Sequence, residues 1–266
     1  MPGPQREVVP IKLDPYFDAK FMALWGDGKS EVNTYKLSDR ASTGTATMTF
    51  RIEQFSNSAR GRAGGKHGPG DAYPVMAMHL VKTIGDEHRM LSCFLSMASV
   101  NRRAGATPTK VVFSAQNSTD HVYGQVLFNS KRLEFINHSY VDSDVDERGE
   151  LGYLEEAFAE DTLFHWARAM ARPFAGNNGD YLYLSSVEDA RLKHRPLTYE
   201  RQALLKEKGS NTIQVPAGAF EVETLRFKRK NGSWRAFSVE KAFPRRIVKW
   251  STSEGESAEL LTTERR

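Results

Sequence analysis

Apolar and polar residues alternate in short runs over most of the chain, and turn-forming residues separate one run from the next. Residues 45–53 are typical of this pattern. The apolar members of this run are Ala46, Met48, Phe50 and Ile52. Successive side chains of a strand point to opposite faces, so a period of two predicts a β-strand with one face in a core and the other in water.

The same kind of run recurs from the first fifth of the chain to its end, and each recurrence predicts a strand. In the first half, the predicted strands are 30–37, 45–53, 75–84, 88–100, 110–116, 122–128 and 132–141. In the second half, they are 181–185, 197–206, 212–215, 219–228, 234–240, 245–250 and 256–263. Short strands at this spacing favour a mainly β fold with a large antiparallel curved sheet, arranged as an open barrel or a sandwich.

One segment breaks the alternating pattern. Between Leu151 and Ala171, apolar residues such as Phe158 and Trp166 recur at helical spacing, and Pro173 follows the segment. We therefore expect one helical segment there. The strongest turn signal is Asn231-Gly232, because both residue types tolerate the positive φ that a two-residue hairpin turn requires.

The order of these segments suggests a simple domain organisation. Residues 1–13 contain three prolines and are predicted to form an extended N-terminal tail. Residues 14–266 are predicted to form a single β-rich domain. A variant of this prediction has two sub-sheets, 14–141 and 180–266, joined by the helical segment.

Composition and charge limit the function classes. Hydrophobic residues make up 39% of the chain, which is enough for a sizeable core and excludes global disorder. The formal net charge is +4, but basic and acidic residues are mixed along the chain, so no nucleic-acid partner is predicted. The basic hairpin 226–235 superficially suits an anionic partner, but lysines that protect a sheet edge from aggregation explain it as well. Cys93 is the single cysteine, which rules out an intramolecular disulfide and predicts a small buried apolar residue.

Familiar catalytic and metal motifs are absent or incomplete. There is no nucleophile elbow, zinc-protease motif or dinucleotide fingerprint, so no cofactor is predicted and an enzymatic activity stays open. Gly65-Lys66 hints at a phosphate loop, but neighbouring positions depart from that motif. Residues 142–146 resemble the start of a calcium loop, but Glu147 stands where the loop needs glycine, so no metal site is predicted.

The best candidate for a ligand site lies in the predicted strand 122–128 and the residue before it. Strand alternation places His121, Tyr123 and Gln125 on one face. Three hydrogen-bonding side chains on one face could line a barrel interior and orient a ligand, or could form the wet side of a sheet. We take these three residues as the candidate ligand-binding residues.

Several segments resemble a group of bacterial envelope proteins of unknown function, which are often mislabelled as septum formation inhibitors. The segments that carry this resemblance are 25–35, 113–116, 121–125, 215–224, 242–250 and 256–260. The run Val-Pro-Ala-Gly-Ala-Phe at 215–220 also resembles a wider β-rich domain of exported proteins, with a curved sheet like that of lipoprotein carriers. The resemblance implies a periplasmic or outer-membrane-associated protein whose signal was removed ahead of this start. It implies no catalytic residues.

From the residues alone, either a cytoplasmic protein or an exported protein whose signal was removed fits, because the start lacks the apolar core of a secretory signal and no later run could span a bilayer. The leading hypothesis is a non-enzymatic envelope protein that binds an apolar or amphipathic ligand, with a lipophilic small molecule as partner and association with a membrane surface as an option. One alternative is a hydrolase that uses His121 with carboxylates from elsewhere. Another is a structural partner-binding module. The sequence leaves the oligomeric state open.

Overall fold

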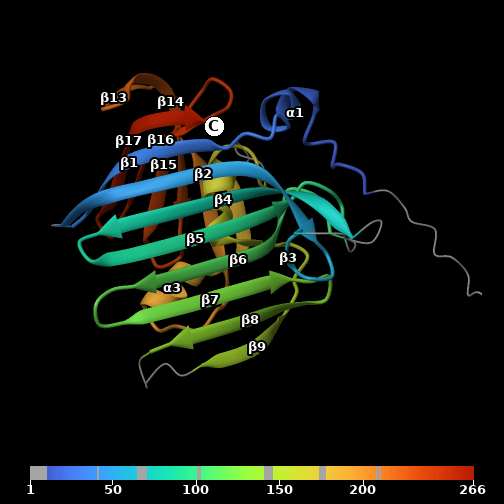
Figure 1. The fold of residues 1–266 in the computed structure, drawn as a ribbon. Helices are drawn as coiled ribbons and strands as arrows, with labels where there is room; N and C mark the ends of the chain where they lie inside the picture. Colours follow the sequence, from blue (N-terminus) through green and yellow to red (C-terminus); the bar gives the residue numbers. More distant parts are fainter. Residues whose placement is uncertain are drawn as a thin grey trace, which may run out of the picture.

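The computed structural model of the protein describes residues 11–40, 42–64, 71–100, 103–140, 146–173, 178–207, 209 and 211–266. Within these residues, one curved sheet of 17 strands contains most of the regular structure, and the helices are few and short (Figure 1). The sheet does not close into a barrel. The predicted mainly β fold with a large curved sheet is therefore confirmed.

The first half of the sheet is an antiparallel meander in which each long strand pairs with the next along the chain. Its strands are β1 (Glu31–Asp39), β2 (Ser42–Ser56), β4 (Ala72–Ile84), β5 (Glu87–Ser96), β6 (Thr107–Gln116), β7 (His121–Phe128), β8 (Arg132–Ser139) and β9 (Glu147–Gly152). The short strand β3 (Gly61–Arg62) pairs with the end of β2.

The second half continues the same sheet from the other side of β1. Its strands are β10 (Ala157–Ala159), β11 (Gly179–Leu184), β12 (Tyr199–Lys206), β13 (Asn211–Val215), β14 (Gly218–Lys228), β15 (Trp234–Glu240), β16 (Ile247–Thr252) and β17 (Glu256–Arg265). β17 pairs antiparallel with β1 and so joins the two halves. Among the strand pairs of the described residues, only β10 and β11 run parallel.

Side chains fill the inside of the curve. The ring of Phe164 lies 5.4 Å from that of Phe237 on β15 and 5.5 Å from that of Trp250 on β16. The ring of the next residue, His165, lies 5.3 Å from that of Phe50 on β2. These contacts join both halves of the sheet to one small helix, and burying each aromatic side chain contributes about 1.5–3 kcal/mol. The helix therefore acts as the centre of the core.

The helices differ in part from the prediction. The predicted helical segment does contain helix, as a 3-10 turn η1 (Glu160–Thr162) followed by α2 (Leu163–Ala167), but its first part forms the end of β9 and all of β10. α1 (Ala19–Trp25) and α3 (Val187–Leu192) were not predicted, because six or seven residues are too few to show a helical period. No helix of the described residues is long and apolar enough to cross a membrane.

The hairpin at Asn231-Gly232 is present between β14 and β15, but the predicted two-residue turn is wrong. The strands are separated by the five residues 229–233. Only Gly232 has a positive φ, at 89°. The side chain of Asn231 instead accepts hydrogen bonds from the backbone N–H of Ser233 at 2.9 Å and from its hydroxyl at 2.7 Å. This side-chain bonding stabilises the longer loop.

Gly124 on β7 lets α3 approach the sheet. A Cβ atom at this position would lie 2.8 Å from Cγ1 of Val187 and 2.9 Å from Cγ of Arg191. We expect Gly124→Ala to lower the free energy of unfolding by about 1–3 kcal/mol in urea denaturation, because α3 must shift. Gly152→Ala on β9 is the control, since a Cβ there meets nothing within 4 Å. Equal effects of the two changes would contradict this account of the packing.

Candidate functional site

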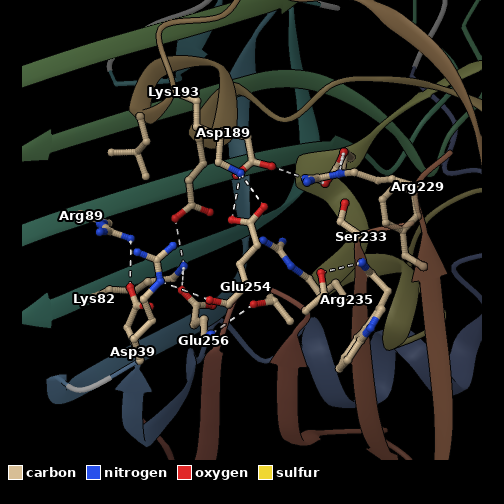
Figure 2. A pocket seen from close by; sticks show the side chains of 18 residues that line it. Asp39, Lys82, Arg89, Asp189, Lys193, Arg229, Ser233, Arg235, Glu254 and Glu256 are labelled. Atoms are coloured by element: carbon tan, nitrogen blue, oxygen red, sulfur yellow. Dashed lines mark hydrogen bonds and ion pairs between the residues drawn. The ribbon is translucent and has the colours of Figure 1, made fainter. Parts of the chain in front are cut away.

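A cavity of about 300 Å³ lies where the two halves of the sheet meet α3. Its wall comes from β1, β4, β5, η1, α3, the β14–β15 hairpin and the β16–β17 turn (Figure 2). The acidic residues that line it are Asp39, Glu160, Glu188, Asp189, Glu254 and Glu256. The basic residues that line it are Arg40, Lys82, Arg89, Lys193, Arg229 and Arg235. We call this the charged cavity.

Lys82 bridges two carboxylates at the cavity wall. It is only 2% exposed, and its Nζ donates to Glu188 Oε1 at 2.9 Å and to Glu256 Oε2 at 2.7 Å. The other oxygen of Glu256 accepts from Trp250 Nε1 at 2.8 Å. Burial alone would lower the pKa of Lys82, but the two carboxylates outweigh it and raise that pKa. Lys82 therefore stays charged in the protein interior.

The same balance acts on Glu256. Burial tends to raise the pKa of this carboxyl, but the charges of Lys82 and Arg235 and the hydrogen bonds from Lys82 and Trp250 lower it to about 2. Glu256 is therefore ionised at neutral pH. The ion pair with Lys82 joins β4 of the first half of the sheet to β17 of the second.

A second bridge is made by Arg229 in the β14–β15 hairpin, which donates to both Glu160 and Asp189. Burial raises the pKa of Glu160 in spite of this partner, because that side chain is fully enclosed. For Asp189 the burial effect is outweighed, chiefly by the Arg229 charge, and its pKa is lowered. At the cavity mouth, Lys193 Nζ contacts Glu254 at 2.7 Å and Asp189 at 3.5 Å (Figure 2).

Arg235 on β15 differs from the other cations of the charged cavity. It is only 9% exposed, and its guanidinium forms no hydrogen bond or ion pair with any residue that the structure describes. Its nearest ring contact is Phe164, whose centroid lies 5.5 Å from Cζ. Burial lowers the pKa of Arg235, but the carboxylates of Glu188, Glu256, Glu160 and Asp189 outweigh this and raise it. Arg235 is therefore a charged donor at the wall that the described protein groups leave unpaired.

One acceptor is left over in the same place. Oε2 of Glu188 is buried and has no hydrogen-bond partner among the described residues. Glu188 is also the largest electrostatic partner of Arg235. Both Arg235 and Glu188 line the charged cavity.

Asp161 fixes the helix that supplies Glu188. Its Oδ1 accepts from the hydroxyl of Ser186 at 2.7 Å, and its Oδ2 accepts from the backbone N–H of Val187 at 2.9 Å. Ser186 in turn caps α3 by accepting from the N–H of Asp189 at 3.2 Å. Burial raises the pKa of Asp161 to about 7. These contacts tie η1 to the start of α3.

The charged cavity was not predicted, although the sequence contains a signal for it. Lys82 continues the inward-facing row of Met76, Met78 and Leu80 on β4. In the same way, Arg235 precedes the inward Phe237 on β15. A charged residue at the end of a series of inward-facing apolar residues indicates a buried polar site. The alternation does not show which of these strand ends lie close together in the fold.

The predicted ligand-binding residues lie elsewhere. His121, Tyr123 and Gln125 share one face of β7, as the alternation predicted, and this face is opposite to the one that packs against α3. The Tyr123 hydroxyl donates to Gln125 Oε1 at 3.2 Å, and the His121 ring lies 5.3 Å from that of Tyr140. His121 and Tyr123 border a shallow depression on this surface. A ligand role for these residues stays a prediction.

The phosphate-loop hint, the calcium-loop resemblance and the predicted N-terminal tail fall wholly or mostly on residues that the structure does not describe. Gly65-Lys66 and residues 142–145 lie outside the described residues, as do residues 1–10 of the predicted tail. Among the residues that the structure does describe, no three or more His, Cys, Asp or Glu side chains are grouped to hold a metal ion.

Comparisons of the chain with protein-family models, with curated proteins and with solved structures find no significant match. The resemblance to envelope proteins, and the location and partners that it implies, stay predictions.

We expect Glu256→Gln to lower the free energy of unfolding by about 3 kcal/mol at neutral pH, because it breaks a buried ion pair. A carboxyl whose pKa is lowered by folding stabilises the protein above its unfolded pKa, and this contribution is lost as the pH falls through the folded value. The stability gap between variant and wild type should therefore close from about pH 4.5 to about pH 2.

Urea denaturation at several pH values measures this gap. Glu259→Gln is the matched control on the same strand, because Glu259 forms a half-exposed pair with Lys249 and its loss should cost at most about 1 kcal/mol. A gap for Glu256→Gln that does not change with pH would show that the ion pair is not its cause.

Proposed function

We propose that this protein is a binding protein for a small polar ligand that carries an anionic group, held in the charged cavity against Arg235. The observation that supports this proposal is the guanidinium of Arg235, which lies at the cavity wall without a hydrogen-bond or ion-pair partner among the described residues. A buried charged donor without a hydrogen-bond partner costs free energy, and a ligand oxyanion would recover it.

The chemistry of arginine defines the kind of group. The guanidinium is a planar fork of donors that matches the two oxygens of a carboxylate or phosphate group. The other buried cation of the cavity wall, Lys82, already has two carboxylate partners. Arg235 is therefore the residue to which we assign the anionic part of the ligand.

The properties of the cavity favour a polar ligand over the apolar or amphipathic ligand expected from the sequence. The inside of the curved sheet is filled by side chains such as Phe164 and Trp250. The charged cavity is lined mainly by ionised groups, and about 300 Å³ is at the small end of the range for ligand sites.

Binding can be tested with a thermal-shift screen of small carboxylates, inorganic phosphate, phosphate monoesters and amino acids, followed by calorimetric titration of the compounds that stabilise the protein. Arg235→Lys keeps the charge but removes the fork, so we expect it to weaken binding by at least about tenfold. Arg226→Lys is the control, because Arg226 pairs with Glu207 and does not line the cavity.

The proposal is wrong if none of these compounds stabilises the wild-type protein. It is also wrong if a compound binds and Arg235→Lys changes its affinity no more than Arg226→Lys does. Both variants should keep the wild-type unfolding transition, which circular dichroism checks before the titrations.

A further inference from the structure

We propose that a neutral oligosaccharide binds to the outer surface of β6, β7 and β8, with one sugar ring packed against Tyr140. The site is the shallow depression that His121 and Tyr123 border, which we call the outer depression. It lies on the face of the sheet opposite to α3 and shares no lining residue with the charged cavity. The proposal is therefore independent of the function proposed for that cavity.

The strand register brings outer side chains of three neighbouring segments together at this depression. Gln116 on β6 is paired with His121 on β7, and the backbone N–H of Tyr140, just after β8, donates to the carbonyl of His121 at 3.1 Å. In the neighbouring row, Ser114 is paired with Tyr123. Side chains two residues apart along a strand share a face, so both rows lie on the same outer surface. All five residues line the outer depression.

Tyr140 presents an aromatic ring to solvent at one side of the depression. It is 71% exposed, and its ring centre lies 5.3 Å from that of His121, with 34° between the two ring planes. Tyrosine is enriched at binding surfaces because its ring offers apolar area and its hydroxyl offers a hydrogen bond. The C–H face of a sugar ring is apolar and can pack against the Tyr140 ring, and His121 extends this contact surface.

The polar side chains of the outer depression match the hydroxyl groups of a sugar. A hydroxyl both donates and accepts hydrogen bonds, and Ser114, Gln116 and His121 supply a hydroxyl, an amide and an imidazole. None of these three side chains has a hydrogen-bond partner among the residues that the structure describes. They are therefore available to ligand hydroxyl groups beside the Tyr140 ring.

The charge of the outer depression argues against an ionic ligand. Among its described lining residues there is no lysine or arginine, and Asp120 is the only acidic residue. A single-stranded nucleic acid also stacks on aromatic side chains, but it requires basic residues along its phosphates. An organic cation is held by a cage of several rings, whereas Tyr140 and His121 lie next to each other on one surface. A neutral sugar fits an exposed ring that is surrounded by uncharged hydrogen-bonding groups.

The size of the outer depression indicates more than one sugar unit. Its volume is about 580 Å³ and it opens to solvent, which lies within the range of about 300–1,000 Å³ for small-molecule sites. An open site holds a few units of a chain while the rest of the chain stays in water. We therefore assign an oligosaccharide in place of a single enclosed monosaccharide.

Binding is tested with an array of neutral oligosaccharides of glucose, galactose, mannose, xylose and N-acetylglucosamine, followed by calorimetric titration of the full chain with those that bind. The ring makes the main contact, so we expect Tyr140→Ala to weaken binding by at least about tenfold and Tyr140→Phe by less than about threefold. Phe243→Ala is the matched control, because Phe243 is a 41% exposed ring outside the depression.

Gln116→Ala tests the hydrogen-bonding part of the site. This variant should weaken binding of the same oligosaccharide by about threefold to tenfold, because it removes an amide that bonds to ligand hydroxyl groups. Gln54→Ala is the control, since Gln54 is exposed on β2 and outside the depression. Tyr140 and Gln116 are both exposed, so the variants should keep the wild-type unfolding transition, which circular dichroism checks.

The proposal is wrong if no neutral oligosaccharide binds the wild-type protein, or if Tyr140→Ala weakens binding no more than Phe243→Ala does. A loss for Tyr140→Phe as large as that for Tyr140→Ala would contradict the packing of a sugar on the ring. Tighter, Tyr140-dependent binding of a single-stranded oligonucleotide or of choline would also overturn it. Arg235→Lys should leave oligosaccharide binding unchanged, so failure of this proposal and failure of the proposed function are distinguishable.

Discussion

The pairing of β1 with β17 is the interaction on which the rest of this structure depends. The register runs from Glu31 opposite Arg265 to Asp39 opposite Glu256, so two strands from opposite ends of the described chain lie side by side over their full length. Without this pairing the molecule would have two separate sheets, each with an exposed edge. With it, one curved sheet surrounds a shared core, and residues of both halves can meet at one cavity.

The charged cavity is a direct result of this pairing. Lys82 comes from the first half of the sheet and Glu256 from the second, and their ion pair lies where the two halves meet. Replacing a buried ion pair by apolar residues of similar size is often neutral or stabilising, so such a pair is weak evidence that stability alone requires it. Among the described residues, the guanidinium of Arg235 in this group has no hydrogen-bond or ion-pair partner, and the proposed binding site rests on this observation. The contacts of Asp161 with the start of α3 hold Glu188 in place beside Lys82.

Much of the secondary structure could be predicted because a strand with one buried face has a period of two that is visible in the sequence. Residues 45–53 show this pattern, and they lie within the long strand β2. The exceptions have local causes. α3 spans only six residues, which are too few for a helical period to appear in the sequence. Its position depends on Gly124, because the absence of a side chain there allows the helix to contact the sheet. The Asn231-Gly232 hairpin was predicted at the right place with the wrong turn, because the side chain of Asn231 bonds to Ser233 and stabilises a longer loop.

The sequence by itself determined the mainly β class, most of the strand positions, and the shared face of His121, Tyr123 and Gln125. These properties depend on residues that are close together in the chain, so the alternation of apolar and polar residues predicts them. Only the tertiary structure decided that Lys82, Glu188, Arg235 and Glu256 surround one cavity, since they come from three strands and a helix that are far apart in the sequence. Whether a buried charge is paired depends on which strand ends meet, and that is set by the register between β1 and β17 and by the packing of α3.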